Sequence, residues 1–394
     1  SNYGIASNDD CREVGQFLFP FRGRAGSMDR IFNTGQGIQM VEVATSPVVT
    51  RQYGELKAGA LLLCLALAYP GALSGFFHSE INLQKAVDWP IAVALWLGVA
   101  LCLCVIYGVV IAGFVVALKA DKLASSSESA TRLRLLAYTV FATPPLFTLF
   151  GLYGDVIIGI PNLAVLAWLV FWAGVAGMFL VRRGASGRQV PWSSRPTVIR
   201  VVHGTSALAI LVIFLLAHIF NHVAGFWSPT AHIAVMTMFR NLYRNDVVQP
   251  ILLALFAVQL VSGYLVLRRY STKRRDWIGC LLASSGAYLA VFIPSHASAV
   301  FIVGRATMKA DTNWWWLTGA PFGMLADAWS VRLIPHYSLA MFLVVAHLSG
   351  GLRTVLVAHG VCERTANRLA VVLVLLGAIG ALMTISGLLG VHLT

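Results

Sequence analysis

Three histidines lie inside long apolar stretches of the chain: His218, His296 and His347. An ionisable side chain is costly in the hydrocarbon core of a membrane, so it usually marks a transport pathway, a proton relay or a cofactor ligand. Neutral imidazole is also a common axial ligand of haem b between membrane helices, where two facing helices each supply one ring nitrogen. These residues therefore predict redox chemistry at a haem, provided that two of them lie at the same depth.

The spacing of the histidines along their helices predicts one such pair. The expected helix over 198–221 holds His203 and His218, 15 residues apart, which is about 22 Å along an α-helix. The expected helix over 277–303 runs in the same direction and places His296 at the depth of His218. We therefore expect His218 and His296 to be the two axial ligands of one haem b.

His347 lies in the other half of the membrane, because its helix runs in the opposite direction. A second haem at that depth needs a second ligand. The expected helix over 248–267 contains no histidine and offers Gln259 and Ser262 there, which are poor haem ligands. His203 is at a compatible depth, but its helix and that of His347 could be neighbours that do not face each other. One haem is therefore expected, and a second is left open.

Further polar residues gather near the membrane boundary closer to His218. They are Asn221, His222, His232, Arg305, Lys309, Arg332 and His336. Basic groups there could pair with haem propionates or a quinone carbonyl, and we take Arg305 as a candidate cofactor contact. The alternative is that they are ordinary interface residues, like Trp314–Trp316, which resembles an aromatic belt. At the opposite boundary His203, Ser206 and Arg353 are candidate quinone contacts.

The elements that must position these residues are membrane helices. The chain of 394 residues is 58% hydrophobic and 11% charged, with a mean hydropathy of +0.76, whereas a soluble domain has about a quarter charged residues. Many stretches reach the roughly 20 apolar residues that cross a bilayer. We predict an all-α polytopic membrane protein with about nine transmembrane helices. The expected spans are 56–77, 90–118, 134–158, 161–181, 198–221, 248–267, 277–303, 335–357 and 369–391.

The net charge of +13 reflects topology and predicts no nucleic-acid partner. The basic residues cluster in every second loop, which is the positive-inside pattern. It places the N-terminus inside and the C-terminus outside, in a bacterial inner (cytoplasmic) membrane or an equivalent energy-transducing membrane.

The six cysteines predict neither a disulfide framework nor covalently bound haem. Cys11 and Cys362 fall on the predicted inner side, which is normally reducing. The sequence has no Cys-x-x-Cys-His motif, so a haem in this chain is expected to be b-type.

The chain divides into two unequal halves at a basic linker over 185–197. Residues 1–53 form a polar tail on the inner side, and 54–184 form a four-helix transmembrane unit without haem ligands. Residues 198–394 form a five-helix, haem-binding bundle. Nine of the ten histidines follow residue 200, so the predicted chemistry belongs to the second half.

This second half resembles the five-helix cytochrome b membrane anchor of succinate:quinone oxidoreductases, the succinate dehydrogenase and fumarate reductase complexes. The resemblance also includes a last helix without membrane-embedded histidines. It rests on His203, His218 and Asn221-His222 in the first helix, Pro-Ser-His296 in the third, and Ala-His347-Leu-Ser-Gly-Gly-Leu-Arg353 in the fourth.

In that family the first and third helices ligate the haem nearer the outer face, and the second and fourth ligate the inner haem. Carried over, His218 and His296 hold the outer haem and His347 matches an inner ligand. Gln259 or Ser262 stands where the second-helix ligand is expected. The resemblance implies a haem b-containing anchor subunit that exchanges electrons with quinone and with flavoprotein and iron–sulfur subunits.

Two other functions stay open. A non-catalytic membrane scaffold or assembly subunit with a structural haem would fit the first half, which has no histidine within its spans. A transporter with a histidine proton relay would need paired carboxylates within its spans. The spans are nearly free of acidic residues, and Asp155 lies at a membrane end.

Overall fold

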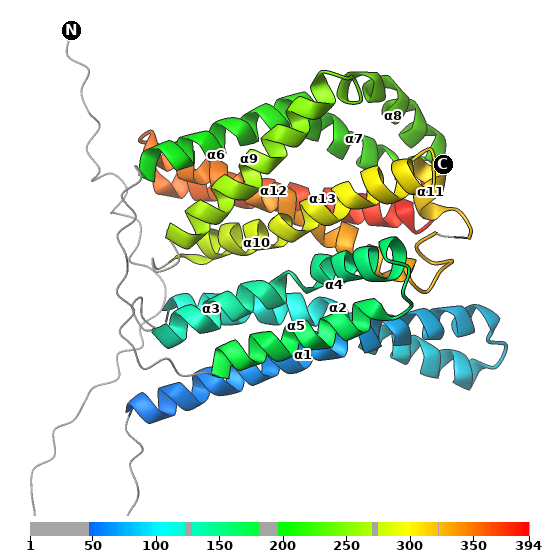
Figure 1. The fold of residues 1–394 in the computed structure, drawn as a ribbon, viewed down its shortest axis with the longest axis horizontal. Coiled ribbons are helices and arrows are strands. Elements are labelled where there is room, and N and C mark those ends of the chain that lie inside the picture. The colour runs from blue at the N-terminus through cyan, green and yellow to red at the C-terminus, as the bar shows by residue number, and fades with distance from the viewer. Residues whose placement is uncertain (1–46, 123–127, 181–195, 270–274, 322, 394) are drawn as a thin grey trace, which may run out of the picture.

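The computed structural model describes five stretches of the chain: 47–122, 128–180, 196–269, 275–321 and 323–393. Every regular element in these stretches is helical (Figure 1), which confirms the all-α class. The predicted polar tail lies outside the described residues up to residue 46, and the predicted linker lies outside them up to residue 195.

Long apolar helices make this an integral, polytopic membrane protein. Among the described residues, eight helices are long and apolar enough to cross a membrane, or nine if one bent pair counts as a single span. The eight are Gly54–Lys85, Trp89–Asp121, Leu163–Leu180, Val198–Ala224, Val248–Arg268, Trp277–Thr307, Ser330–Ala358 and Glu363–Leu388.

The bent pair replaces the straight span expected over 134–158. Helix α3 (Glu128–Phe141) and helix α4 (Thr143–Gly151) meet at a bend of 58°. Pro144 and Pro145 occupy the first turn of α4. Proline lacks a backbone N–H and its ring clashes with the preceding turn, so an uninterrupted helix cannot continue through this point.

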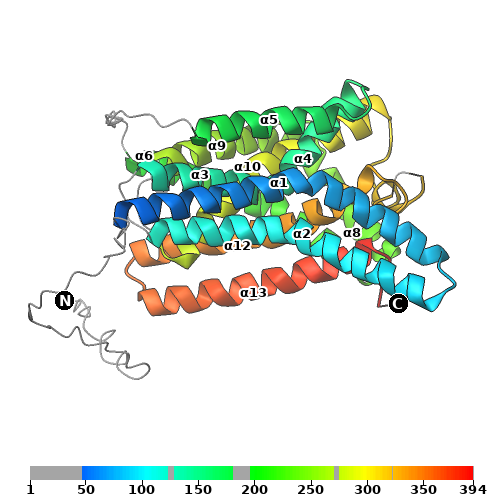
Figure 2. The ribbon, with the colours of Figure 1, turned by 90° about the horizontal axis from the view of Figure 1, so that it is seen from below.

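The first half packs around aromatic side chains. Helices α1 (Pro47–Lys85) and α2 (Trp89–Lys122) lie side by side (Figure 2). On α5 (Leu163–Leu180), Trp168 is fully buried, and its indole Nε1 donates a 3.0 Å hydrogen bond to the Ala66 carbonyl of α1. This contact fixes α5 against α1, opposite α2.

The second half carries the histidine-bearing spans. Helix α8 lies outside the membrane-spanning stretches, and neither it nor α11 was expected from the sequence. The elements are α6 (Pro196–Ile210), η3 (Leu211–Leu215), α7 (Leu216–Ala224), α8 (Pro229–Tyr243), α9 (Val248–Arg269), α10 (Trp277–Ser298), η4 (Ala299–Thr307), α11 (Trp314–Thr318), η5 (Ser330–Arg332), α12 (Leu333–Ala358) and α13 (Glu363–Leu388).

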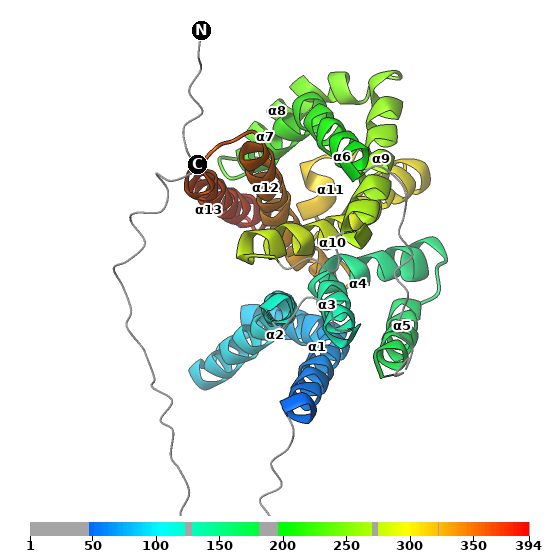
Figure 3. The same cartoon turned by 90° about the vertical axis from the view of Figure 1, so that its left-hand side faces the viewer.

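One helix pair and one set of three helices build this half. Helix α6 packs along α9, and α10 packs along α12, which in turn packs along α13 (Figure 3). Elements α6, η3 and α7 form one continuous span, with a π-helical turn at η3. The first histidine-bearing span therefore packs against α9 through α6 and against α8 and α13 through α7, and it lies across the bundle from α10 and α12.

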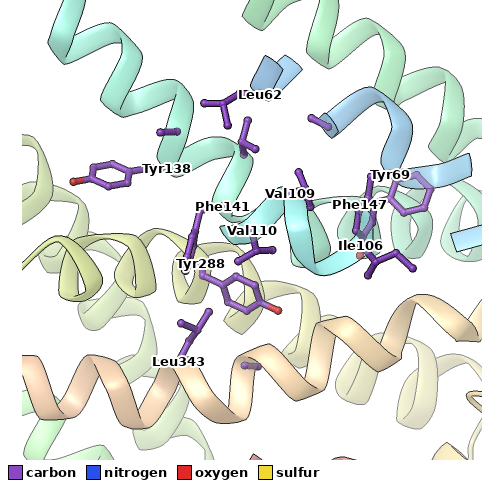
Figure 4. Packing of buried hydrophobic residues seen from close by; sticks show 14 of the residues in the cluster. Leu62, Tyr69, Ile106, Val109, Val110, Tyr138, Phe141, Phe147, Tyr288 and Leu343 are labelled. Atoms are coloured by element: carbon purple, nitrogen blue, oxygen red, sulfur yellow. The ribbon is translucent and has the colours of Figure 1, made fainter. Parts of the chain in front are cut away.

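The two halves share one hydrophobic core. Helix α10 packs against α2, α3 and α4 of the first half. The rings of Phe141 and Tyr288 meet edge to face, with centroids 6.2 Å apart, and Leu343 of α12 belongs to the same buried cluster (Figure 4). At one edge of this contact the buried carboxylate of Asp121 pairs with Arg134 at 2.5 Å and with Arg275 at 3.8 Å.

The two ends of the bundle differ in composition. One end, here called the basic end, carries Arg200, Arg268, Arg353 and Arg364 and corresponds to the predicted inner side. The other, here called the tryptophan end, carries Trp89, Trp227, Trp314, Trp315 and Trp329.

One cysteine departs from the expectation. Cys362, at the N-cap of α13, is disulfide-bonded, so the prediction of a reduced thiol is wrong there. It lies between α12 and α13, outside the spans. Of the other described cysteines, Cys64, Cys102, Cys104 and Cys280 are free.

Candidate functional site

The histidines of the second half form two pairs at different depths. On α6, His203 lies against His347 of α12, with ring centroids 6.2 Å apart. On α7, His218 lies 6.0 Å from His296 of α10 by the same measure. The structure thus brings the expected pair together, and it also pairs the two histidines whose relation the sequence left open.

Both separations suit two imidazoles on one iron. A metal–imidazole bond is about 2 Å long, which places each ring centroid about 3 Å from the metal and the two centroids about 6 Å apart. The angles between the ring planes are 85° for the His203 pair and 53° for the His218 pair. Two rings that share an axis through a metal can twist about it, so either angle is compatible with axial ligation.

The helices that carry the two members of each pair are not packed closely against each other. Within the described residues, α6 packs closely along α9, whereas its Cα atoms scarcely approach those of α10 or α12 within 8 Å. The imidazoles reach across this wider spacing. A four-helix bundle that holds a porphyrin needs the same arrangement, in which ligands come from helices that do not touch along their length.

Hydrogen bonds fix the tautomer of His203. The Ser262 hydroxyl on α9 donates to the Val258 carbonyl at 2.5 Å, so its oxygen is an acceptor for the His203 Nδ1–H, 2.9 Å away. With the proton on Nδ1, the lone pair is on Nε2, where a metal would bind. Partners of this kind orient a ligating imidazole and raise its basicity.

The same tautomer follows for His347. Its Nδ1 lies 3.1 Å from the Leu282 carbonyl, which can only accept, and 3.2 Å from the Ser285 hydroxyl. Nδ1 must therefore carry the proton, and Nε2 keeps the lone pair. Each histidine of the basic-end pair is thus held by a serine from a neighbouring helix.

Two glycines admit these imidazoles. A Cβ on Gly263 would lie 3.2 Å from the His203 Cε1 atom, and a Cβ on Gly286 would lie 3.1 Å from the His347 Cε1 atom. Both distances are tighter than ordinary van der Waals contact, so any larger residue would push the ring away. The helix that was expected to supply a ligand supplies instead Ser262 and Gly263, which support His203.

Gln259 of α9 supports α6 through hydrogen bonds. Its side-chain amide donates to the His203 carbonyl and to the Ser206 hydroxyl, both at 2.7 Å. These bonds tie α9 to α6 one turn from the ring of His203. Gln259 and Ser262, which are poor haem ligands, therefore support the helix and the ring of His203.

The tryptophan-end pair is held by aromatic rings. Phe214 stacks on His218 with centroids 4.6 Å apart, and Phe292 stacks on His296 at 5.4 Å with nearly parallel planes. The His296 Nδ1 is buried and has no hydrogen-bond partner among the described residues. In both cases phenylalanine precedes histidine by four residues, a repeated signal that the sequence reading missed.

The π-helical turn η3 lies between the two histidines of the first span. In a regular α-helix a spacing of 15 residues leaves about 60° between two side chains. A π-helical turn absorbs one extra residue, so His203 and His218 behave as if 14 residues apart, which leaves about 40° between them. Nothing in the sequence identified this turn.

Three more histidines line the tryptophan end, and two are more deeply buried than expected for surface residues. His222 lies 4.6 Å from His218 and 5.6 Å from His232 by ring centroids. His232 and His336 are only 5% and 1% exposed. Burial lowers the pKa of His232, which lies outside the spans, to about 3, so its imidazole is neutral at physiological pH.

Arg305 belongs to a cluster of arginines at the tryptophan end. Its Nη1 donates to the Gln249 side chain at 2.8 Å, and its guanidinium lies over the Phe301 ring. Arg240 and Arg244 from the end of α8 contribute to the electrostatic environment of the same group. The predicted basic contact is therefore present as one of three guanidinium groups.

Other predicted boundary residues lie elsewhere. Arg332 is buried between the two halves, 3.8 Å from the Asp155 carboxylate and stacked on Phe147. Arg353 at the basic end forms ion pairs with Asp276 at 2.6 Å and with Glu363 at 2.9 Å. Arg332 thus stabilises the packing of the halves, and Arg353 ties α12 to the starts of α10 and α13.

The described residues contain no cluster of three or more His, Cys, Asp and Glu side chains that would hold a metal ion on its own. Haem iron needs only two side chains, because the porphyrin supplies its other four ligands. Comparison of the chain with protein-family models, with curated proteins and with solved structures finds no match.

Proposed function

We propose that this chain is a membrane cytochrome b that binds two haem b groups. The observation that carries the proposal is the pair of imidazole–imidazole separations, 6.2 Å and 6.0 Å, at two depths of one helix bundle. One haem would be held by His203 and His347 and the other by His218 and His296. This goes beyond the single haem expected from the sequence, because His203 is close enough to serve as the missing ligand.

The residues present fit such a group. His203 and His347 have their protons on Nδ1, which leaves Nε2 for the metal, and glycines admit both rings. His296 has a buried Nδ1 without a described partner. When bound, haem supplies one-electron redox chemistry. The chain orients the ligands, excludes water with Phe214 and Phe292, and sets the polarity around each site.

The placement of the pairs suggests a transmembrane role. His203 and His218 are separated by about 22 Å along their span, a large part of the roughly 30 Å hydrocarbon core. We infer a haem-containing anchor subunit, like that of succinate dehydrogenase or fumarate reductase complexes. In this proposal it carries electrons between quinone and partner flavoprotein and iron–sulfur subunits.

The proposal includes a four-plus-five arrangement of nine spans. The basic end would face the inside of a bacterial cytoplasmic or equivalent energy-transducing membrane. Because His203 is assigned to iron, Ser206 and Arg353 stay as candidate quinone contacts at that end.

A second candidate is a membrane scaffold or assembly subunit in which haem is structural. The packing of α10 against three helices of the first half favours it, since these helices contribute no histidine to either pair. A redox-silent haem in a larger complex would support this reading.

The deciding measurement is haem stoichiometry in the purified chain. Reduced-minus-oxidised spectra and a pyridine haemochrome assay should give two haems b per wild-type chain. His218→Ala and His347→Ala should each remove one of them. The matched control is His359→Ala, because His359 is exposed at the end of α12 and bonds only to its own helix. It should keep both haems.

Other results would revise the proposal. One haem that is lost in His218→Ala and kept in His347→Ala would restrict binding to the tryptophan-end pair. No haem in any variant would reject the cytochrome and leave the scaffold.

A further inference from the structure

The tryptophan end contains three neighbouring arginines, and among the described residues only one of them forms an ion pair with a carboxylate. Arg240 lies in the last turn of α8, Arg244 caps that helix, and Arg305 lies in η4. Arg240 pairs with Asp311 at 2.7 Å. Arg244 donates to the Thr312 hydroxyl at 2.8 Å, and Arg305 donates to the Gln249 amide oxygen. Among the described residues, neither Arg244 nor Arg305 forms an ion pair with a carboxylate.

The three guanidinium groups are also only partly satisfied. The Nε atom of each is buried and lacks a hydrogen-bond partner among the described residues. Desolvation, together with repulsion from Arg240 and Arg305, lowers the pKa of Arg244. A partly buried positive charge without a counter-ion is unfavourable. An anionic ligand that paired with Arg244 and Arg305 would therefore be stabilising.

The cluster borders the tryptophan-end histidine pair from two sides: Arg240 and Arg244 lie at the end of α8, and Arg305 lies in η4, which continues the helix of His296. Tyr243, between Arg240 and Arg244 in sequence, packs edge-on against Phe214 with centroids 5.4 Å apart, and Phe214 stacks on His218. From the other side, the Arg305 guanidinium lies 4.6 Å from the centroid of the Phe301 ring. It therefore points back along its span, as helical side chains do, toward His296.

We propose that Arg240, Arg244 and Arg305 bind the two propionates of the haem held by His218 and His296. This inference rests on the proposed function. Three guanidinium groups balance one aspartate and two propionates. A guanidinium presents a planar fork that matches a carboxylate in two parallel hydrogen bonds. The cluster thus selects a haem edge as well as a charge, so it orients the porphyrin with its propionates toward the tryptophan end.

The test combines charge-removing variants with a change in the ligand. Arg244→Gln, Arg305→Gln and the double variant keep side-chain bulk and hydrogen-bonding capacity. Arg364→Gln is the matched control, because Arg364 is an exposed arginine at the basic end. Haem content and the midpoint potential of each haem are measured for all four. The haem-free wild type and double variant are then loaded with haem or with its propionate dimethyl ester, and affinities are compared.

We expect only the haem that disappears in His218→Ala to respond. Each single variant should lower its midpoint potential, because an unneutralised propionate disfavours the reduced iron. The double variant should weaken haem binding at this site by about tenfold or more per guanidinium removed, the size of a charge-assisted hydrogen bond. The dimethyl ester should bind wild type and double variant equally, and Arg364→Gln should behave as wild type.

Three results would overturn the inference. Unchanged potential and affinity in the double variant would show that the propionates lie elsewhere. Loss of co-purified anionic phospholipid with intact haem binding would assign the cluster to a lipid phosphate. Equal weakening of haem and dimethyl ester would reveal a merely structural role. In all three cases the wild type still carries its haems, whereas a haem-free wild type would overturn the proposed function itself.

Discussion

The two histidine pairs reach nearly the same ring separation by different physical means. At the basic end, His203 and His347 each donate a hydrogen bond from Nδ1 to a serine, with a glycine against each ring. At the tryptophan end, His218 stacks on Phe214 and His296 stacks on Phe292. One pair is directed by polar partners and the other by stacking.

The two environments control different properties of the imidazole. A hydrogen bond to Nδ1 fixes both the tautomer and the direction of the lone pair. A stacked ring fixes the plane of an imidazole and keeps water away, but leaves the tautomer to other groups. If both pairs hold iron, the basic-end site should depend on single polar atoms, and the tryptophan-end site should depend on apolar bulk.

The largest expected effect comes from removing ligands in combination. His203→Ala/His347→Ala removes both members of one pair and should cost one haem per chain, no more than either single variant. His203→Ala/His218→Ala removes one member of each pair and should cost both haems. The pyridine haemochrome assay counts them. Equal losses in the two double variants would refute the pairing.

A smaller effect is expected from filling the glycine contact at the basic end. Gly286→Val places carbon atoms where a Cβ alone would already lie 3.1 Å from the His347 ring. Overpacking typically costs about 1–3 kcal/mol, so the basic-end haem should bind roughly tenfold more weakly. Gly204→Ala is the control, since a Cβ there meets nothing within 4 Å. If Gly286→Val weakens the other haem instead, the assignment of the two sites is reversed.

Removing the serine hydroxyls should give a graded effect. Ser262 provides the hydrogen bond described for His203 Nδ1, so Ser262→Ala should weaken the basic-end haem by about tenfold, the lower range for lost second-shell partners. Ser285→Ala should do less, because the Leu282 carbonyl still accepts from His347. Haem retention in a competition with apomyoglobin measures both. The comparison of environments fails if the tryptophan-end haem responds equally to either change.

The smallest effect concerns acid. The pKa of His232 is about 3 in the fold and about 6.5 in an unfolded chain. The unfolded state therefore binds more protons between these values, and stability falls as pH drops below 6.5. From pH 7 to pH 5 this amounts to about 2 kcal/mol. Thermal unfolding in detergent should show that wild type loses more stability over this interval than His232→Gln. An identical loss would contradict the buried neutral imidazole.

Much of the fold could be predicted from the sequence, because membrane helices are recognised by the length and hydropathy of their apolar stretches. The positions of His218 and His296 at one depth followed from counting residues along helices of known rise. The bend at Ala142 was not predicted, although Pro144 and Pro145 lie inside the expected span over 134–158, where proline kinks or breaks a helix.

The second histidine pair was harder to predict for a different reason. Depth can be read from sequence, but which helices face each other depends on packing that no single span encodes. The structure sets α6 beside α9 and leaves α12 opposite, so His203 meets His347. The arginine cluster was visible only as Arg305, because Arg240 and Arg244 belong to α8, which is too short and too polar to resemble a span.

The buried ion pairs between the halves bear on how this protein could be divided or evolve. A fragment that begins at the second half would contain Arg275 without Asp121 and Arg332 without Asp155. Such a fragment is a poor candidate for independent expression. Two fragments produced from separate genes should instead recognise each other through these charges, which makes the chain a natural subject for split-protein complementation.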